Sequence, residues 1–168
     1  MKKVLIAYFS LTGKTELMAQ YIAEGVRISG QEVVVSKISD LKRADDLAGY
    51  DGYIFGSPTY HRDMADPMKT FLFLARKADL EGKLAGAFGS YTHSGDAPAV
   101  LFDTMQYVYK MEPFELGALN LKEALLEETG RGEQTPRQYI SGEVHGEANE
   151  GRRACHDYGR VFGEKLGS

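Results

Sequence analysis

Apolar residues follow two alternating spacings along the chain, and these spacings predict alternating strands and helices. A continuous apolar run, typical of a strand buried on both faces, covers residues 4–9, and further strands are predicted at 33–35, 53–55, 84–88 and 114–121. Helical spacing of apolar residues covers 17–26, 68–75, 100–109 and 154–166. Strands that alternate with helices predict an α/β fold, in which a doubly wound five-stranded parallel sheet carries helices on both faces.

The same pattern predicts one domain over residues 1–168, with no internal repeat and no linker. One segment, at about residues 122–146, does not fit the alternation, because it is rich in Gly, Glu and polar residues and is interrupted by Pro136. An irregular stretch of this length inside a compact domain usually serves function or forms an interface. We therefore expect an insertion that borders a site or a partner, such as a second copy of the chain.

Composition and charge narrow the range of partners. The chain has 168 residues, of which 43% are hydrophobic and 26% charged, and its formal net charge is −4. This weak negative charge argues against nucleic acid, which binds basic faces. No apolar run is long enough for a signal peptide or a membrane span. The single cysteine, Cys155, cannot form an internal disulfide, so we expect a cytoplasmic protein without a membrane partner.

The first predicted strand is followed by a loop rich in hydroxyl groups, at the edge where ligands bind in doubly wound sheets. The backbone amides of this loop precede a helix, and free amides together with the helix dipole favour a bound anion. A simple N-capped helix is the alternative, because Ser and Thr are common in caps. The candidate phosphate-binding residues are Ser10, Leu11, Thr12, Gly13, Lys14 and Thr15.

A nucleotide P-loop is a rival interpretation, since Gly13-Lys14-Thr15 matches the end of that motif. The first glycine of the motif would fall at Tyr8, and Ser57 follows the third strand where a magnesium-binding aspartate would be needed. A response regulator would also need an aspartate there. No G-x-G-x-x-G follows the first strand, so the sequence gives no support to a Rossmann dinucleotide site.

Two further loops, after the third and fourth strands, should lie beside the first, because the carboxyl ends of parallel strands share one edge. Each combines glycine and hydroxyl groups with flat side chains. This mixture suits a planar heterocycle, whose edge bonds to backbone groups and whose plane is covered by rings. For any one of these aromatic or histidine side chains, the alternative is that it is simply exposed on the loop and binds nothing. The candidate residues are Pro58, Thr59, Tyr60, His61 and Met64 in the second loop, and Ser90, Tyr91, Thr92, His93 and Gly95 in the third.

The three loops together resemble those of the flavodoxin-like FMN-binding family. Residues 10–15 resemble its S-x-T-G-N-T phosphate loop, with Lys14 at the asparagine position. Residues 56–59 resemble its second loop. Residues 87–91, together with Ser94-Gly95, resemble the third loop in the flavodoxin domain of flavodiiron proteins. The resemblance covers roughly residues 3–121 and 148–166, and it implies a flavodoxin-like fold.

The resemblance further implies that FMN is the cofactor and that its phosphate is held by Ser10, Thr12, Gly13, Lys14 and Thr15. It implies that the second loop lines one side of the isoalloxazine ring and that the third loop lines the other. Two positions depart from the family pattern. His93 stands where the flavodiiron domain usually has Trp, and Lys14 adds a positive charge to a loop that normally has none.

Two functions share this predicted site. One is an electron carrier between partner proteins, which the flavodiiron-like loops and the modest size favour. The other is NAD(P)H-dependent reduction of quinones, as in reductases related to the tryptophan-repressor-binding protein. Those enzymes carry a Gly-rich segment whose start resembles Thr135-Pro136, and the 122–146 insertion favours this function. The redox partner is therefore either a protein or a small quinone acceptor.

The histidines do not predict a metal site. His61, His93, His145 and His156 are scattered, without the paired i, i+4 spacing of metal-binding helices. The di-iron ligands of the flavodiiron oxidase domain are absent from the sequence, so we expect no reduction of oxygen or nitric oxide in the manner of those proteins. Cys155 lies on an apolar helix face and is expected to be a packed thiol.

Overall fold

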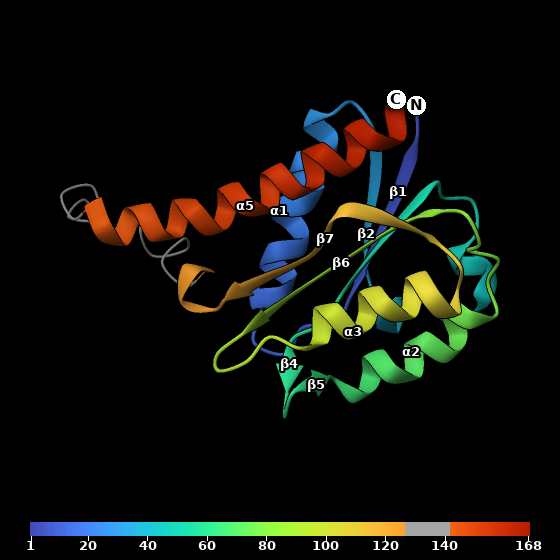
Figure 1. Cartoon of the computed structure of the whole chain (residues 1–168), viewed down its shortest axis with the longest axis horizontal. Coiled ribbons are helices and arrows are strands. Elements are labelled where there is room, and N and C mark those ends of the chain that lie inside the picture. The colour runs from blue at the N-terminus through green and yellow to red at the C-terminus, as the bar shows by residue number, and fades with distance from the viewer. Residues whose placement is uncertain (127–141) are drawn as a thin grey trace.

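The strands of the computed structural model form one five-stranded parallel sheet in the order β2-β1-β3-β6-β7 (Figure 1). The structure describes the backbone of residues 1–126 and 142–168, and the side chains of 1–126 and 150–168. Each strand overlaps one of the predicted strands, and the predicted doubly wound α/β fold is confirmed. The strands are β1 (Lys3–Tyr8), β2 (Glu32–Lys37), β3 (Gly52–Gly56), β6 (Leu84–Tyr91) and β7 (Glu112–Lys122).

Helices lie on both faces of the sheet (Figure 1). One face is covered by α1 (Lys14–Ile28) and α5 (Gly142–Gly167), and the other by α2 (Asp66–Arg76) and α3 (Ala97–Asp103). A π-helical turn at Thr104–Val108 continues α3. The helix predicted over 100–109 therefore begins earlier, with a proline in its first turn, where a missing N–H costs nothing.

The sheet separates two apolar cores, which explains the continuous apolar run at residues 4–9. Successive side chains of a strand point to opposite faces. On β1, Val4 and Ile6 pack in the core under α1 and α5, whereas Leu5 and Ala7 pack in the core under α2 and α3. Because β1 is an interior strand and covered on both sides, its residues 4–8 are all apolar and buried.

The connection from β2 to β3 contains two 3₁₀ turns, at Ile38–Asp40 and Ala44–Leu47, in place of an α-helix. β2 is the edge strand, and its valines at 33–35 are only half-buried. As an edge strand, β2 is therefore less covered than the interior strands. Short turns cover less of a sheet than a helix does. The face of the sheet that carries α2 is therefore less covered near the edge strand β2.

Most of the predicted 122–146 insertion, including Pro136, lies outside the described residues. Its last residues, 142–146, belong to the backbone of α5. The prediction of irregular structure is wrong for these residues, because the last helix begins well before the apolar positions that identified it at 154–166. Thr135 also lies outside the described residues.

α1 and α5 approach each other at the level of their backbones. A side chain added at Gly25 of α1 would overlap the carbonyl oxygen of His156, and one added at Gly159 of α5 would overlap that of Ile22. Glycine at these two positions therefore lets the helices come closer than any larger residue would allow. Beside this contact, His156 Nε2 lies 2.7 Å from Glu24 Oε2.

The ladder between β6 and β7 is interrupted, and a buried side chain occupies the interruption. The pairing shifts register between Ala85 and Ala87. The Tyr158 hydroxyl of α5 donates to the Gly117 carbonyl at 2.6 Å and accepts from the Ala87 N–H at 3.1 Å. Burial raises the pKa of Tyr158, so the hydroxyl keeps its proton for the donated bond.

The substitution Tyr158→Phe should lower the free energy of unfolding by about 1–3 kcal/mol, because it removes a partner from the buried Ala87 N–H and from the half-buried Gly117 carbonyl. Urea unfolding followed by circular dichroism measures the change. Tyr107→Phe is the matched control, since that ring is 65% exposed and its change should stay within about 0.5 kcal/mol. Equal unfolding midpoints for the two variants would contradict the role of Tyr158.

Candidate functional site

The three predicted loops meet at the carboxyl edge of the sheet, because they follow the three adjacent strands β1, β3 and β6. Backbone bonds continue between them beyond the strands. Phe9 N–H donates to the Gly56 carbonyl at 3.0 Å, and Ser57 N–H donates to the Phe88 carbonyl at 3.1 Å. The starts of the first and second loops are therefore fixed to neighbouring strands, and their remaining residues project beyond the sheet.

The first loop turns into α1 around one serine hydroxyl. Ser10 Oγ accepts from the Gly13 N–H at 3.1 Å and from the Glu16 N–H at 3.2 Å. Gly13 has a φ of 91°, in the left-handed region that favours glycine. Within the described residues, the N–H groups of Thr12, Lys14 and Thr15 have no acceptor. These free donors at a helix N-terminus suit an anion.

A buried hydroxyl pair joins the first loop to the third. Thr15 Oγ1 and Ser90 Oγ lie 3.1 Å apart, and both residues are almost fully buried. The resemblance assigned Thr15 to the phosphate and Ser90 to the ring, and the structure brings the two together. One hydroxyl donates to the other, so the pair keeps one further O–H to donate to a ligand.

The second loop is a two-residue β-hairpin, which the sequence did not predict. β4 (Thr59–Tyr60) pairs antiparallel with β5 (Asp63–Met64). The turn residues His61 and Arg62 have φ values of 51° and 64°, and both are exposed. Such a turn favours Asn and Gly, so His and Arg here carry backbone strain of the kind found at functional sites.

Buried Ser57 anchors this hairpin to the sheet. Its Oγ donates to the Pro58 carbonyl at 2.9 Å and accepts from the Ala65 N–H at 3.1 Å. Thr59 Oγ1 accepts from the Ala97 N–H at 3.0 Å, which ties the hairpin to the start of α3. Met64 is buried beneath the hairpin, in the core under α2 and α3. It therefore does not present its side chain at the surface of the loop.

The third loop is held by two residues at the end of β7 that the sequence analysis missed. Asn120 Nδ2 donates to the Gly95 carbonyl, and the Glu123 N–H donates to the Tyr91 carbonyl at 2.9 Å. Burial, with a smaller contribution from the Glu123 carboxylate, raises the pKa of Tyr60, which lies in the hairpin.

Asn120 could have been identified from the sequence, because it is a polar residue near the carboxyl end of the fifth predicted strand.

The exposed rings of the site come from two loops. Tyr60 is 36% exposed at the hairpin. In the third loop Tyr91 is half-buried, while Thr92 and His93 are exposed. The hairpin and the third loop therefore offer flat side chains at one edge, beside the free amides of the first loop.

The described residues give no support to a metal site, a membrane-spanning helix or a reactive cysteine. Within the described residues, no group of three or more His, Cys, Asp and Glu could hold a metal ion. None of the described helices is both long and apolar enough to span a membrane. Cys155 is buried, and burial raises its pKa to about 12, which keeps the thiol protonated and unreactive.

A family model for flavodoxin matches residues 6–138. The chain belongs to the flavodoxin family. It is 31% identical to a flavodoxin of Clostridium saccharobutylicum, over 98% of this chain and 94% of that protein. It is 36% identical to an NAD(P)H dehydrogenase (quinone) of Rhodopseudomonas palustris strain BisA53, over 61% of this chain and 63% of that protein. The second match thus spans less than two thirds of the relative.

Solved structures share the fold over nearly the whole chain. A flavodoxin from the domain Archaea has a TM-score of 0.78 at 24% identity, and the match covers 99% of each chain. The flavodiiron protein of Giardia intestinalis has a TM-score of 0.76 at 20% identity, over 99% of this chain and 36% of that one. The predicted resemblances to flavodoxins, flavodiiron proteins and quinone reductases are confirmed.

Flavodoxins bind FMN, and the residues of this flavodoxin fit that cofactor. Free amides and hydroxyl groups at the start of α1 suit a terminal phosphate. The hairpin and third loop offer flat side chains and backbone groups for a planar ring. The electron-transfer chemistry belongs to the cofactor, while the protein supplies binding, orientation and access.

Ser10→Ala should weaken FMN binding about 5- to 100-fold, because the loop loses the acceptor that holds two of its N–H groups and a hydroxyl beside the phosphate. Titration of the apoprotein with FMN, followed by fluorescence quenching, measures the affinity. Ser36→Ala is the matched control, since among the described residues this hydroxyl bonds to the Lys37 carbonyl alone, near the end of β2. Equal affinity of the Ser10 variant and wild type would show that the loop does not depend on Ser10.

Arg62→Gly should raise the free energy of unfolding by about 0.5–1 kcal/mol, because glycine adopts a positive φ without the cost that arginine carries. Thermal unfolding with and without FMN measures the gain. Lys110→Gly is the matched control, as Lys110 has a φ of 59° at a turn away from the loops. The strain assigned to the hairpin would be wrong if Arg62→Gly destabilised the protein while Lys110→Gly stabilised it.

Proposed function

We propose that this flavodoxin carries electrons one at a time between partner proteins, with FMN held among its three loops. The observation that supports it most is the meeting of the three loops at one edge of the sheet in a chain that matches a flavodoxin over nearly its full length. The proposed FMN-binding residues are Ser10, Leu11, Thr12, Gly13, Lys14, Thr15, Pro58, Thr59, Tyr60, His61, Met64, Ser90, Tyr91, Thr92, His93 and Gly95.

Within this proposal the first loop holds the phosphate mainly through its backbone. The N–H groups of Thr12, Lys14 and Thr15 are free donors, and the helix dipole of α1 adds a favourable field. The half-buried Lys14 supplies a positive charge that the usual asparagine would not. Leu11 contributes its backbone, because its side chain is 70% exposed.

The second and third loops hold the ring in this proposal. Tyr60 and His61 from the hairpin, and Tyr91 and His93 from the third loop, provide flat surfaces on its two sides. Met64 and Ser90 are buried and would contribute indirectly. Met64 packs beneath the hairpin and supports it, and Ser90 is hydrogen-bonded to Thr15. Rings on both sides would leave only the edge of the cofactor open, which suffices for electron transfer and obstructs hydride transfer.

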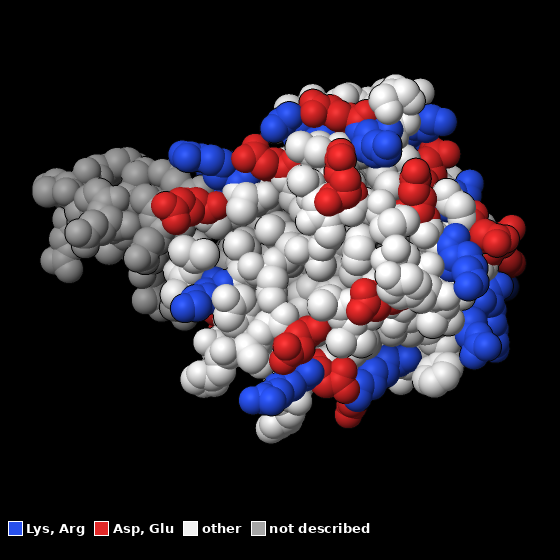
Figure 2. Space-filling view, in the orientation of Figure 1, with Lys and Arg blue, Asp and Glu red and all other residues white. Residues whose placement is uncertain are grey.

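The same edge offers side chains to a partner protein. Leu11 and Tyr60 are exposed beside the site and provide apolar contacts. On the face shown in Figure 2, cationic and anionic side chains are interspersed, without the continuous basic surface that nucleic acid would favour. The single cysteine of the chain agrees with a cytoplasmic location, where thiols stay reduced.

A second candidate is an NAD(P)H-dependent quinone reductase, which the quinone dehydrogenase of Rhodopseudomonas palustris favours. That enzyme would use the same FMN site and would need open space over the ring for nicotinamide. Its match is partial, whereas the flavodoxin match covers 98% of this chain. The two functions differ in the number of electrons that move in each step.

Stepwise dithionite reduction of the FMN-loaded protein should pass through two separate one-electron stages, because a carrier exchanges single electrons. NADH or NADPH alone should bleach the visible flavin band little within a minute, because the ring faces are covered. Anaerobic absorbance spectroscopy measures both, with free FMN as the control. Reduction by either nucleotide within seconds, catalytic reoxidation by benzoquinone and a single two-electron stage would favour the reductase instead.

A further inference from the structure

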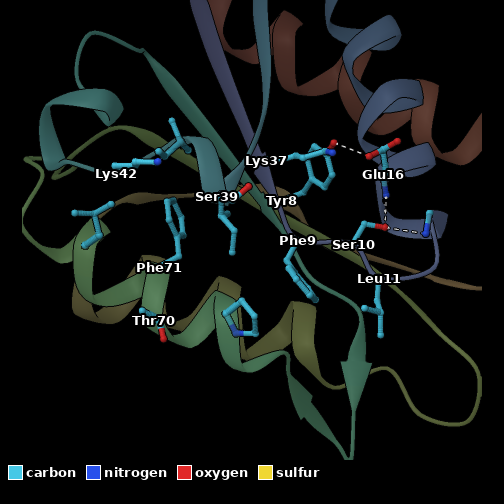
Figure 3. Close-up of a pocket in the computed structure, with 15 residues that line it drawn as sticks. Tyr8, Phe9, Ser10, Leu11, Glu16, Lys37, Ser39, Lys42, Thr70 and Phe71 are labelled. Atoms are coloured by element: carbon cyan, nitrogen blue, oxygen red, sulfur yellow. Dashed lines mark hydrogen bonds between the residues drawn. The ribbon is translucent and has the colours of Figure 1, made fainter.

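A cavity of about 980 Å³ lies beside the first loop, and no residue of the hairpin or the third loop lines it (Figure 3). It is bounded by the end of β1, the residues that follow β2, and α2. Figure 3 shows Phe9, Ser39 and Phe71 around this space, one from each of these elements. Of the proposed FMN-binding residues, only Ser10, Leu11 and Gly13 also line it.

The missing crossover helix explains the cavity. The two 3₁₀ turns between β2 and β3 cover the sheet less than a helix, and a space remains between the first of them and α2. Phe71 and Ile38 form part of its wall and are still more than nine-tenths buried. Tyr8 belongs to the packed core as well, whereas most other lining residues are half-buried or exposed, so the cavity opens to solvent.

The walls combine an apolar floor with a cationic rim. Lys37 and Lys42 are exposed at the rim, and neither forms an ion pair within the part of the chain that the structure describes. The apolar wall consists of Phe9, Ile38, Leu41, Pro67, Phe71 and Leu74.

The lining contains a single carboxylate among its described residues, Glu16, and this group already has a partner. The Tyr8 hydroxyl donates to Glu16 Oε1 at 2.9 Å (Figure 3). Burial, together with Glu16, raises the pKa of Tyr8 to about 12, so the tyrosine stays protonated and keeps donating at neutral pH. The lining thus carries two lysines and one carboxylate that is already hydrogen-bonded, and this balance of charge favours an anion.

We propose that this cavity binds a small aromatic carboxylate or an organic anion of similar shape, at a site separate from that of FMN. The volume falls at the upper end of the range for small-molecule sites, about 300–1,000 Å³. A flat apolar body would lie against Phe9 and Phe71, where it buries surface from water. Its acidic group would lie at the rim, in the positive field of Lys37 and Lys42, which Figure 3 shows on different sides of the space.

The first loop separates the two sites. Ser10, Leu11 and Gly13 border the cavity on one side, while the free amides at the start of α1 serve the FMN phosphate. Both ligands can therefore occupy the protein at once. The inference rests on the cavity alone, and it holds whether the FMN-bound chain acts as a carrier or as a reductase.

The test uses 2-naphthoate and the FMN-loaded protein, with binding measured by isothermal titration calorimetry. Naphthalene-2-carboxamide, which has the same rings without the charge, should bind several-fold more weakly. Lys37→Gln and Lys42→Gln should each weaken naphthoate binding about threefold, and the double variant about tenfold, as expected for exposed charge pairs. These variants should leave carboxamide binding unchanged. Lys165→Gln, in the last turn of α5, is the matched control.

A second variant tests the location of the site. Thr70 is an exposed residue of α2 in the cavity wall, so Thr70→Trp should fill the space and abolish binding of both compounds without unfolding the protein. Naphthoate should also bind the apoprotein with similar affinity, which keeps this test independent of the FMN proposal. The proposal is overturned if FMN displaces naphthoate, if the charge-removing and control lysine variants bind equally, or if a folded Thr70→Trp variant still binds it.

Discussion

The close packing of α5 against α1 is the contact on which the positions of the loops depend. Gly25 and Gly159 let the two backbones meet, and this fixes where the N-terminus of α1 lies at the sheet edge. The same α5 inserts the Tyr158 hydroxyl between β6 and β7. One helix thus positions both the first loop, through α1, and the third loop, through β6. The hydrogen bond between Thr15 and Ser90 joins the first loop to the third.

The three loops differ in how they are held. The first is organised by its own backbone around Ser10, and the third by bonds from the end of β7. The hairpin is fixed at its base by Ser57, while its tip carries positive φ values at His61 and Arg62. Local strain of this kind persists only where the surroundings hold it in place. The rigid base and strained tip suit a loop that must present side chains to a flat ligand.

Apolar spacing alone predicted the strands, the helices and their alternation, because buried parallel strands and amphipathic helices have distinct periods. The topology rule then brought the three loops to one edge. Spacing could not predict the hairpin, since His61-Arg62 is not a usual turn pair, nor the shift between β6 and β7 that Tyr158 accommodates. Such features depend on contacts between residues far apart in the sequence, as do the bonds from Asn120 and Glu123. FMN itself came from the family resemblance, because hydroxyls and amides alone specify only an anion.

The absence of a helix between β2 and β3 connects the fold to both proposed sites. A helix there would cover β2 and fill the space beside α2, and only one side of the first loop would face a ligand. With two short turns instead, the loop borders a proposed ligand site on each side. It would present its free amides to the FMN phosphate on one side, and Ser10, Leu11 and Gly13 to the cavity on the other. Because the crossover is short, one loop of the fold can border two separate ligands.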